Sequence, residues 1–299
     1  MPEPYKYIRT EPIDDGTIVR IWLDRPDFRN AQNRGLLVEL GEAFLAAEAD
    51  DRVRVVILAG AGPLFSAGHD MGTPDAIAER RGGPSEHSTS VSYGGTRGAV
   101  EGRFLQEWHF FFQNTLRWRN LRKITIAQVQ GKSFAAALML AWACDLIVAS
   151  DDAQFADVVG TRLGMCGLEY FAHPWEFGAR KAKELLLTGD TIDAEEAHRL
   201  GMVSKIFPRA RLDEDTVTFA RRIAKLPTAA ALFIKESVNQ TVDNQGFHNA
   251  LNAAFTLHQV NHAHWAEVHG DHGGVARVED GIEDWRTAAP PVLSAVDQP

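Results

Sequence analysis

The first residues that could do chemistry are a glycine and a histidine that follow an apolar run. Residues 53–59 are apolar apart from Arg54, as expected of a strand covered on both faces. Gly68 lets the backbone bend sharply, so the N–H of His69 can point into a cavity instead of pairing with a strand. An N–H directed into a cleft can form half of an oxyanion hole, which stabilises negative charge on a carbonyl oxygen. The sequence therefore predicts one such donor at His69.

A second donor is predicted at the start of a short apolar helix. Residues 124–129 indicate another buried strand, Gly131 ends it, and residues 135–143 indicate the helix. The first turn of a helix has free N–H groups and the positive end of the helix dipole. Two donors that converge on one oxygen would stabilise an enolate.

A repeated alternation of strands and helices must position these two donors. A turn at 14–16 predicts a hairpin within residues 5–24, and apolar residues at helical spacing predict a helix over 34–49. The further predicted elements are a helix over 101–122, strands over 145–149 and 202–207, a capped helix over 194–200, and helices over 212–225, 228–243 and 247–268. This order favours an α/β fold with a helical C-terminal region.

Residues 72–100 interrupt this alternation, because they are rich in glycine, proline and polar residues and show no sustained period. Such a length is unusual for a connection within a compact domain. Its position after His69 predicts a lid over the ligand. The alternative is a loop without functional contacts.

The composition is that of an ordinary soluble globular protein, with 45% hydrophobic and 24% charged residues in a chain of 299. The formal net charge of −9 argues against a general nucleic-acid or anionic-membrane surface, although a local basic cluster can still bind phosphates. Cys144 and Cys166 are the two cysteines, which favours a reduced protein without disulfides. The chain has no run as long as a membrane span and no signal-peptide core, so we expect a cytoplasmic protein.

His258 and His262 stand four residues apart on an expected helix, a spacing that can chelate a metal ion. No acidic or cysteine pattern in the sequence completes the ligand set, so we expect surface histidines and no metal site. No glycine-rich dinucleotide fingerprint follows a predicted strand, so NAD and FAD are not expected.

Taken in order, these segments resemble the crotonase (enoyl-CoA hydratase/isomerase) superfamily over residues 5–265. The matching landmarks are residues 23–26 with Asn30 and Ala31, then 55–71, 129–145, 152–155, 186–190 and 194–207. The resemblance implies an α/β fold with a crotonase-type β-α-β superhelix (spiral) core over residues 1–209. A C-terminal helical trimerisation region over 210–270 would complete the site and build a homotrimer or a dimer of trimers, and 271–299 would be a polar tail.

The resemblance also implies an acyl-coenzyme A thioester as the ligand, with its carbonyl between the backbone N–H groups of His69 and Ala136. Family members usually have three glycines where this chain has alanines at 135–137; alanine still donates its N–H but narrows the pocket wall. The positions implied to contact substrate are Arg29, Ala31, Ala67, Gly68, Asp70, Met71, Met139 and Val159. No cofactor is implied besides the coenzyme A of the substrate.

The two glutamates that position and activate water in the family's hydratases are missing from this chain. Counting from Gly131 puts Met139 at the first position, and counting from Phe155 puts Val159 at the second, or Gly160 if one extra residue shifts the count. None of these side chains can transfer a proton, and each carboxylate contributes about 10²–10⁴-fold as a general acid or base. We therefore do not expect hydration by the usual mechanism.

Glu169 is the candidate replacement, because it lies near the position at which dienoyl-CoA isomerases and chlorobenzoyl-CoA dehalogenase place a catalytic aspartate. Beside an apolar acyl tunnel its pKa should be raised, which suits proton transfer. The structural alternative is an ion pair with Arg162 or a cap on a helix over 170–178. Asp157 is the second candidate, or else a turn or surface acid.

Two classes of function follow from these residues. The first is an acyl-CoA lyase or isomerase of fatty acid metabolism, which stabilises a thioester enolate through His69 and Ala136 and moves a proton with Glu169. Isomerisation needs only one such group, so it fits better than hydration. The second is a non-catalytic acyl-CoA-binding paralogue, and an acyl-CoA thioester hydrolase also stays open. The expected partners are an acyl-CoA and further copies of the chain, without nucleic acid or membrane.

Overall fold

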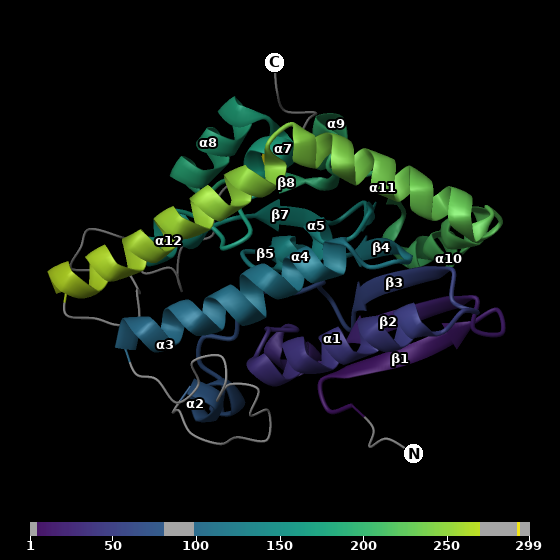
Figure 1. Ribbon diagram of the computed structural model, residues 1–299, viewed down its shortest axis with the longest axis horizontal. Helices are drawn as coiled ribbons and strands as arrows, with labels where there is room; N and C mark the ends of the chain where they lie inside the picture. The colour runs from purple at the N-terminus through teal and green to yellow at the C-terminus, as the bar shows by residue number, and fades with distance from the viewer. Residues whose placement is uncertain (1–4, 81–98, 270–291, 294–299) are drawn as a thin grey trace.

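A six-stranded sheet lies at the centre of the computed structural model, which describes residues 5–80, 99–269 and 292–293. Its order is β1-β2-β3-β4-β6-β9; β1 and β2 pair antiparallel and all other neighbours are parallel. The strands are β1 (Ile8–Ile13), β2 (Ile18–Leu23), β3 (Val55–Gly60), β4 (Ile124–Val129), β6 (Leu146–Ser150) and β9 (Lys205–Phe207). Because β3 and β4 are parallel neighbours, the two predicted donor segments both follow the carboxyl ends of these strands, on the same side of the sheet (Figure 1).

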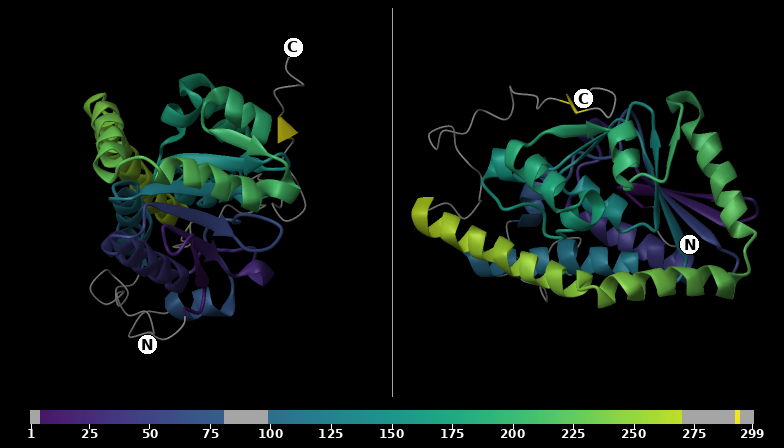
Figure 2. Two further views of the ribbon diagram at one scale, coloured as in Figure 1. Left: turned by 90° about the vertical axis from the view of Figure 1, so that its right-hand side faces the viewer. Right: turned by 90° about the horizontal axis from the view of Figure 1, so that it is seen from above.

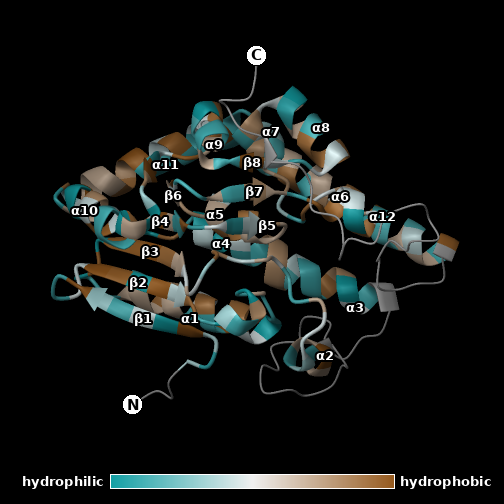
Figure 3. Cartoon of the chain, turned by 180° about the vertical axis from the view of Figure 1, so that it is seen from behind, coloured by the Kyte–Doolittle hydropathy of each residue, from teal (hydrophilic) through white to brown (hydrophobic). Residues whose placement is uncertain are grey.

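Both faces of this sheet are covered, which explains its continuous apolar runs. Val56 and Leu58 of β3 belong to the main core with helix α1 (Arg34–Ala49), whereas Val55 and Ile57 pack in a second cluster with helix α10 (Leu212–Ala224). Figure 3 shows β2 and β3 as apolar along most of their length. Alternate residues of one strand therefore serve two cores.

A second, smaller sheet continues the spiral above the first (Figure 1). Its order is β10-β8-β7-β5, and β7 and β8 pair antiparallel while the other neighbours are parallel. The strands are β5 (Lys132–Phe134), β7 (Gln154–Ala156), β8 (Thr191–Asp193) and β10 (Val292–Leu293). Short helices lie between and beside these strands: α5 (Ala137–Trp142), α6 (Val159–Leu163), α7 (His173–Phe177), α8 (Ala179–Thr188) and α9 (Ala194–Leu200).

Long helices enclose one side of the molecule. Helix α11 (Thr228–Asn244) and helix α12 (Phe247–His269) run one after the other, as the right-hand view of Figure 2 shows. Beside α12 lies a continuous helical rod of α3 (Ala99–Gln106), a π-helical segment (Glu107–Gln113) and α4 (Asn114–Arg119). Phe255 joins the two, with its ring 6.0 Å from that of Phe104 and 4.8 Å from that of Phe112.

The predicted α/β fold class is confirmed, and so are the hairpin, the helix over 34–49, the strand over 124–129 and the capped helix over 194–200. The prediction of irregular structure at 72–100 is wrong at both ends, where helix α2 (Pro74–Arg80) and the start of α3 lie. Residues 81–98 and most of the predicted tail lie outside the described residues. The division of the chain at 209 and 270 stays a prediction. In the described parts of the chain, no helix is both long and apolar enough to cross a bilayer.

Candidate active site

The two predicted donor segments lie side by side. Ser66 and Ser133 form a parallel bridge, and the N–H of Phe134 donates to the carbonyl oxygen of Ser66 at 3.2 Å. Gly68 has φ +93°, and a Cβ there would lie 3.0 Å from the nitrogen of Ala136. Glycine is required at 68 because both the backbone conformation and the space demand it.

The backbone N–H groups of His69 and Ala136 are the two predicted donors. Gln32 pairs with this strand through the carbonyl oxygen of Gly68 (2.8 Å) and the N–H of Asp70 (3.0 Å), so the N–H of His69 faces away from Gln32. Across residues 5–80 and 99–269, neither the His69 nor the Ala136 N–H has a hydrogen-bond acceptor. Two unpaired donors on adjacent segments are what an oxyanion hole requires.

The alanine run keeps this geometry at the cost of backbone strain. Ala135 adopts φ +51°, in the left-handed region that glycine normally occupies, while Ala136 is at φ −59° and directly precedes helix α5 as its N-cap residue. The N–H of Ala135 donates to the carbonyl oxygen of Ala156 at 2.8 Å, which anchors the strained residue to β7. A left-handed alanine costs roughly 1–2 kcal/mol.

The loop that carries His69 is held by a buried ion pair. Nη1 of Arg25 lies 2.8 Å from Oδ2 of Asp70, and both side chains are almost fully buried. Asp70 also accepts hydrogen bonds from the backbone N–H of Thr73 at 3.0 Å and from its hydroxyl at 2.6 Å. The Asp70 side chain therefore serves to position the loop, and its predicted substrate contact stays a prediction.

The other predicted binding residues form two groups. Arg29 and Ala67 are exposed and joined by a hydrogen bond from the Ala67 N–H to the Arg29 carbonyl oxygen at 3.0 Å, next to the half-buried Ala31. The half-exposed Met71 continues the same loop. Met139 and Val159, which were predicted to stand where the family's hydratases have glutamates, are instead buried in the main core.

Glu169 is buried beside the donor loop. Its Oε2 lies 3.3 Å from Nε2 of His69, and its Oε1 lies 3.7 Å from Nε2 of His258. The His69 ring stacks on Phe111 with the ring centroids 3.7 Å apart, which fixes the imidazole next to the carboxylate. The structural alternatives are wrong: Arg162 is not among the partners of Glu169, and the next helix, α7, begins only at His173.

The predicted direction of the Glu169 pKa shift is also wrong. Burial alone would raise the pKa, but the neighbouring His69 and His258 outweigh burial and lower the pKa of Glu169 to about 2. The group is thus a permanent carboxylate near neutral pH. It suits the role of a base or a nucleophile better than that of an acid.

Asp157 forms a second buried carboxylate–imidazole pair. Its Oδ2 lies 2.8 Å from Nε2 of His173, and its Oδ1 accepts from the Val159 N–H at 2.9 Å. The edge of Trp142 packs on the His173 ring with the ring centroids 4.9 Å apart. The prediction of a surface acid at 157 is wrong, because only 3% of the residue is exposed.

Sequence reasoning missed a third cluster, formed by Glu107, His258 and His262, which lie within hydrogen-bond or ion-pair range of one another. The histidines were expected at the surface, but they are 3% and 6% exposed. Their spacing of four residues was the available signal. The acid that completes the cluster comes from the π-helical segment, about 150 residues earlier in the chain, where no local pattern connects it to them.

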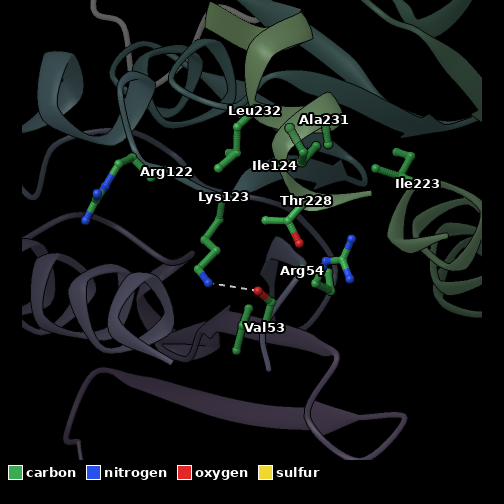
Figure 4. A pocket seen from close by; sticks show the side chains of 9 residues that line it. All are labelled: Val53, Arg54, Arg122, Lys123, Ile124, Ile223, Thr228, Ala231 and Leu232. Carbon is green, nitrogen blue, oxygen red and sulfur yellow. Dashed lines mark hydrogen bonds between the residues drawn. The ribbon is translucent and has the colours of Figure 1, made fainter. Parts of the chain in front are cut away.

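A small cavity lies at the amino ends of β3 and β4, at the end of these strands that is opposite to the donor segments (Figure 4). It is lined by residues just before β3 and β4 and by helices α10 and α11, and Nζ of Lys123 donates to the Val53 carbonyl oxygen beside it at 2.9 Å. Its volume of about 10 Å³ holds roughly one water molecule. This cavity is therefore too small to hold a substrate, and it lies at the end of the strands that is opposite to His69 and Ala136.

Comparisons with known proteins agree with this geometry. The family model described as "Enoyl-CoA hydratase/isomerase" matches residues 14–89 and 100–286. The Mycobacterium tuberculosis protein named "Putative enoyl-CoA hydratase EchA13" is 65% identical over 297 residues, which is 99% of this chain and 93% of that protein. A 4-chlorobenzoyl coenzyme A dehalogenase of an Arthrobacter species is 28% identical over 266 residues, covering 87% of this chain and 88% of the relative.

Solved structures extend the likeness to three dimensions. The crystal structure of a probable enoyl-CoA hydratase from Mycobacterium smegmatis has a TM-score of 0.78 and 41% identity, covering 89% of this chain and 98% of that chain. The spiral fold, the paired donor segments and the match of the family model over most of the chain lead to one conclusion: this chain belongs to the enoyl-CoA hydratase/isomerase family.

Proposed function

We propose that this chain is an acyl-CoA isomerase that stabilises a thioester enolate between the backbone N–H groups of His69 and Ala136. The observation that carries the proposal is the pair of unpaired donors on adjacent segments with one buried carboxylate, Glu169, in contact with the His69 side chain. The assignment of a coenzyme A thioester as the substrate rests on the names of the relatives and of the family.

In this mechanism the Glu169 carboxylate takes a proton from the substrate carbon next to the double bond. The electron pair moves through the conjugated system to the thioester oxygen, where the two N–H groups stabilise the charge. The same proton then returns to a different carbon, which moves the double bond without a net change in atoms. One base suffices for both transfers.

Hydration is less well supported than isomerisation. A hydratase of this family needs two carboxylates around one water molecule, and Met139 and Val159 occupy those positions as buried apolar side chains. A thioester hydrolase or a binding protein without turnover stays the alternative.

The exposed loop of Arg29, Ala67 and Met71 is proposed to receive the coenzyme A moiety, with the Arg29 guanidinium near a phosphate. The substrate brings the only cofactor, and no metal or nucleotide is needed for the isomerisation itself. Binding of coenzyme A phosphates by a local basic residue is compatible with the net charge of −9.

Self-association is proposed through the C-terminal helices, as a homotrimer or a dimer of trimers. Large apolar side chains are exposed on α11 and α12, where a single chain leaves them in solvent. Phe233 is 70% exposed, Leu257 64% and Ile234 58%. Large exposed apolar side chains on these two helices suit an interaction surface between copies of the chain.

The test compares the parent protein with Glu169→Gln on trans-2-enoyl-CoA and 3-enoyl-CoA esters of several chain lengths. We expect the parent to interconvert the two series, and the variant to lose about 10²–10⁴-fold in kcat. Its affinity for a saturated acyl-CoA should stay within a few-fold of the parent.

Glu195→Gln, on the exposed surface of helix α9, is the matched control and should behave as the parent. Equal turnover by the Glu169→Gln and parent proteins would remove Glu169 from the mechanism. Rapid loss of the enoyl absorbance through added water would instead establish hydration.

A further inference from the structure

The cluster of Glu107, His258 and His262 is buried and plays no part in the proposed isomerisation. The Nε2 atoms of the two histidines are 3.0 Å apart. Oε1 of Glu107 lies 3.2 Å from Nε2 of His262, and Oε2 of Glu107 lies 3.6 Å from Nε2 of His258. Three side chains thus converge on one point.

Two rigid elements hold these side chains. His258 and His262 are one helical turn apart on the same face of α12, and their ring centroids are 4.7 Å apart. Glu107 is the first residue of the π-helical segment in the neighbouring rod, and Figure 1 shows α12 running beside that rod. π-Helical turns inside α-helices occur frequently at functional sites.

Outer hydrogen bonds orient the groups toward the centre of the cluster. Nδ1 of His258 lies 2.9 Å from the carbonyl oxygen of Gly167; because that oxygen can only accept, Nδ1 carries a proton, and Nε2 offers its lone pair to a ligand when the ring is neutral. Nε2 of Gln259 donates to Oε2 of Glu107 at 2.7 Å. Protein metal ligands are typically fixed by such a second set of contacts.

The surroundings of the His258 Nε2 atom show what is needed at the centre. Within 4 Å it faces three groups: the His262 nitrogen at 3.0 Å, a Glu107 oxygen at 3.6 Å and a Glu169 oxygen at 3.7 Å. A single proton shared between the two ring nitrogens satisfies only one of these contacts. A cation satisfies both lone pairs and offsets the buried negative charge of the carboxylates.

We propose that Glu107, His258 and His262 bind one divalent transition-metal ion of the zinc class. An ion with tetrahedral ligands at about 2.0–2.1 Å has ligand–ligand edges of about 3.3 Å. The two ring nitrogens are 3.0 Å apart, and the two Glu107 oxygens lie 3.2 and 3.6 Å from the nitrogens that they face. One ligand atom from each of the three residues lies within 4.8 Å of the others, so small shifts of the side chains would reach the tetrahedral spacing. Imidazole and carboxylate are a ligand set that zinc accepts, and three protein ligands leave one position open.

Glu169 stays outside this ligand set because His69 holds it on its other side at 3.3 Å. The site borders the proposed isomerase base, since Oε1 of Glu169 lies 3.7 Å from Nε2 of His258. Binding of metal by the Glu169→Gln variant and its loss of turnover are measured separately, so one proposal can fail without the other.

Arg103 supplies a test with a defined sign. Its Nη1 lies 3.4 Å from Nδ1 of His262, and a guanidinium can only donate. A metal ion bound to Nε2 of a neutral His262 requires the ring proton to be on Nδ1. The Nδ1–H group and the Arg103 guanidinium would then be two donors facing each other, which is unfavourable. Arg103→Gln offers an acceptor at that place and should bind zinc several-fold more tightly than the parent.

The experiment uses the full-length protein after treatment with a chelator, titrated with zinc by calorimetry and with cobalt by visible absorption. We expect one ion per chain and the intense absorption of tetrahedral cobalt. Glu107→Gln and His262→Gln should each bind zinc at least about 100-fold more weakly, more than the loss of an outer contact causes. His264→Gln, an exposed position on the same helix, is the control and should bind as the parent.

Circular dichroism of each variant establishes that it is folded. A folded parent that binds neither ion, or that binds them no better than the folded Glu107→Gln and His262→Gln variants, would overturn the proposal. The cluster would then be a hydrogen-bonded group in which His262 donates to His258. Unchanged or weaker zinc binding by Arg103→Gln would contradict the assigned ligand atom on His262.

Discussion

At the residue scale, the site depends on backbone groups more than on side chains. The proposed donors at His69 and Ala136 are backbone amides, so they are kept through changes of residue type as long as the backbone conformation is kept. An alanine run can therefore stand where the resemblance to the family implies glycines. The cost is visible at Ala135, with its φ of +51°.

Replacing Ala135 with glycine should therefore stabilise the protein. Removal of the Cβ relieves roughly 1–2 kcal/mol of left-handed strain, and the added freedom of the unfolded chain returns about 0.4–1 kcal/mol of it. We expect a net gain of up to about 1 kcal/mol in the free energy of unfolding, measured by urea denaturation.

Ala137→Gly is the matched control, because Ala137 is already helical and buried. There the same change should destabilise the protein by about 1 kcal/mol. Destabilisation by both substitutions would show that Ala135 is not strained in solution.

Glu169 shows where reasoning from residues stops. Its position in the chain identified it as a candidate, but the direction of its pKa shift depends on His69 and His258, which lie 100 and 89 residues away. A carboxylate near an apolar pocket is expected to have a raised pKa only if no cation shares the pocket. The sequence contains no local sign of these contacts.

At the scale of elements, buried ion pairs fix the loops that carry the donors. Arg25 and Asp70 join the segment after β2 to the segment after β3. The helix over 34–49 and the strand over 124–129 were predicted to the residue, because apolar residues at helical spacing and a buried-strand run mark them locally. Helix α2 was missed although Thr73, which accepts a hydrogen bond from the Ala76 N–H at 3.4 Å, and Pro74 mark its start. The predicted helix over 101–122 includes the π-helical segment, but the sequence prediction did not distinguish π from α geometry.

Arg25→Met should destabilise the fold by about 3–5 kcal/mol, because it leaves the Asp70 carboxylate buried without its partner. Arg9→Met is the control: Arg9 pairs with Asp24 at 3.5 Å, but both side chains are largely exposed, so the loss should be below about 1 kcal/mol. Thermal unfolding of the two variants measures the difference. Similar small losses in both would refute a positioning role for the Arg25–Asp70 pair.

At the scale of the whole molecule, the spiral core brings together groups that are distant in sequence. Two parallel strands bring the donors to one edge, and the long α12 returns over the rod of α3 and α4 to place His258 beside Glu169. The fold class and the meeting of the segments at Ser66 and Ser133 could be predicted because they rest on short local patterns. The buried histidines could not, since their burial follows from how α12 packs.

One consequence for the whole fold is a dependence of stability on pH. Burial raises the pKa of Glu176 to about 7, above its ordinary 4.5. A raised pKa in the folded state means that this stabilising contribution is complete below pH 4.5 and is lost as the pH rises through 7. Glu176→Gln should therefore unfold at a higher temperature than the parent at pH 8, where its free energy of unfolding exceeds that of the parent by at most about 3 kcal/mol. Near pH 4 the two proteins should unfold at the same temperature.

Glu214→Gln, on an exposed position of α10, serves as the reference for this pH series. Its unfolding temperature should follow that of the parent at each pH. If Glu176→Gln also follows the parent at pH 8, then Glu176 is solvated in the folded protein.

The most direct test of proton transfer by Glu169 through a thioester enolate is to follow the protons of a bound substrate. A 3-enoyl-CoA ester incubated with the protein in deuterium oxide, followed by proton nuclear magnetic resonance, reports enolate formation whether or not water adds. We predict movement of the double bond to the 2-enoyl position with the parent protein, with deuterium entering only to the extent that the proton held by Glu169 exchanges with solvent. Neither change should occur with Glu169→Gln, although that variant still binds the ester. Binding of the ester by the parent with neither isomerisation nor exchange would contradict the proposed mechanism and identify a protein that holds acyl-CoA without reacting it.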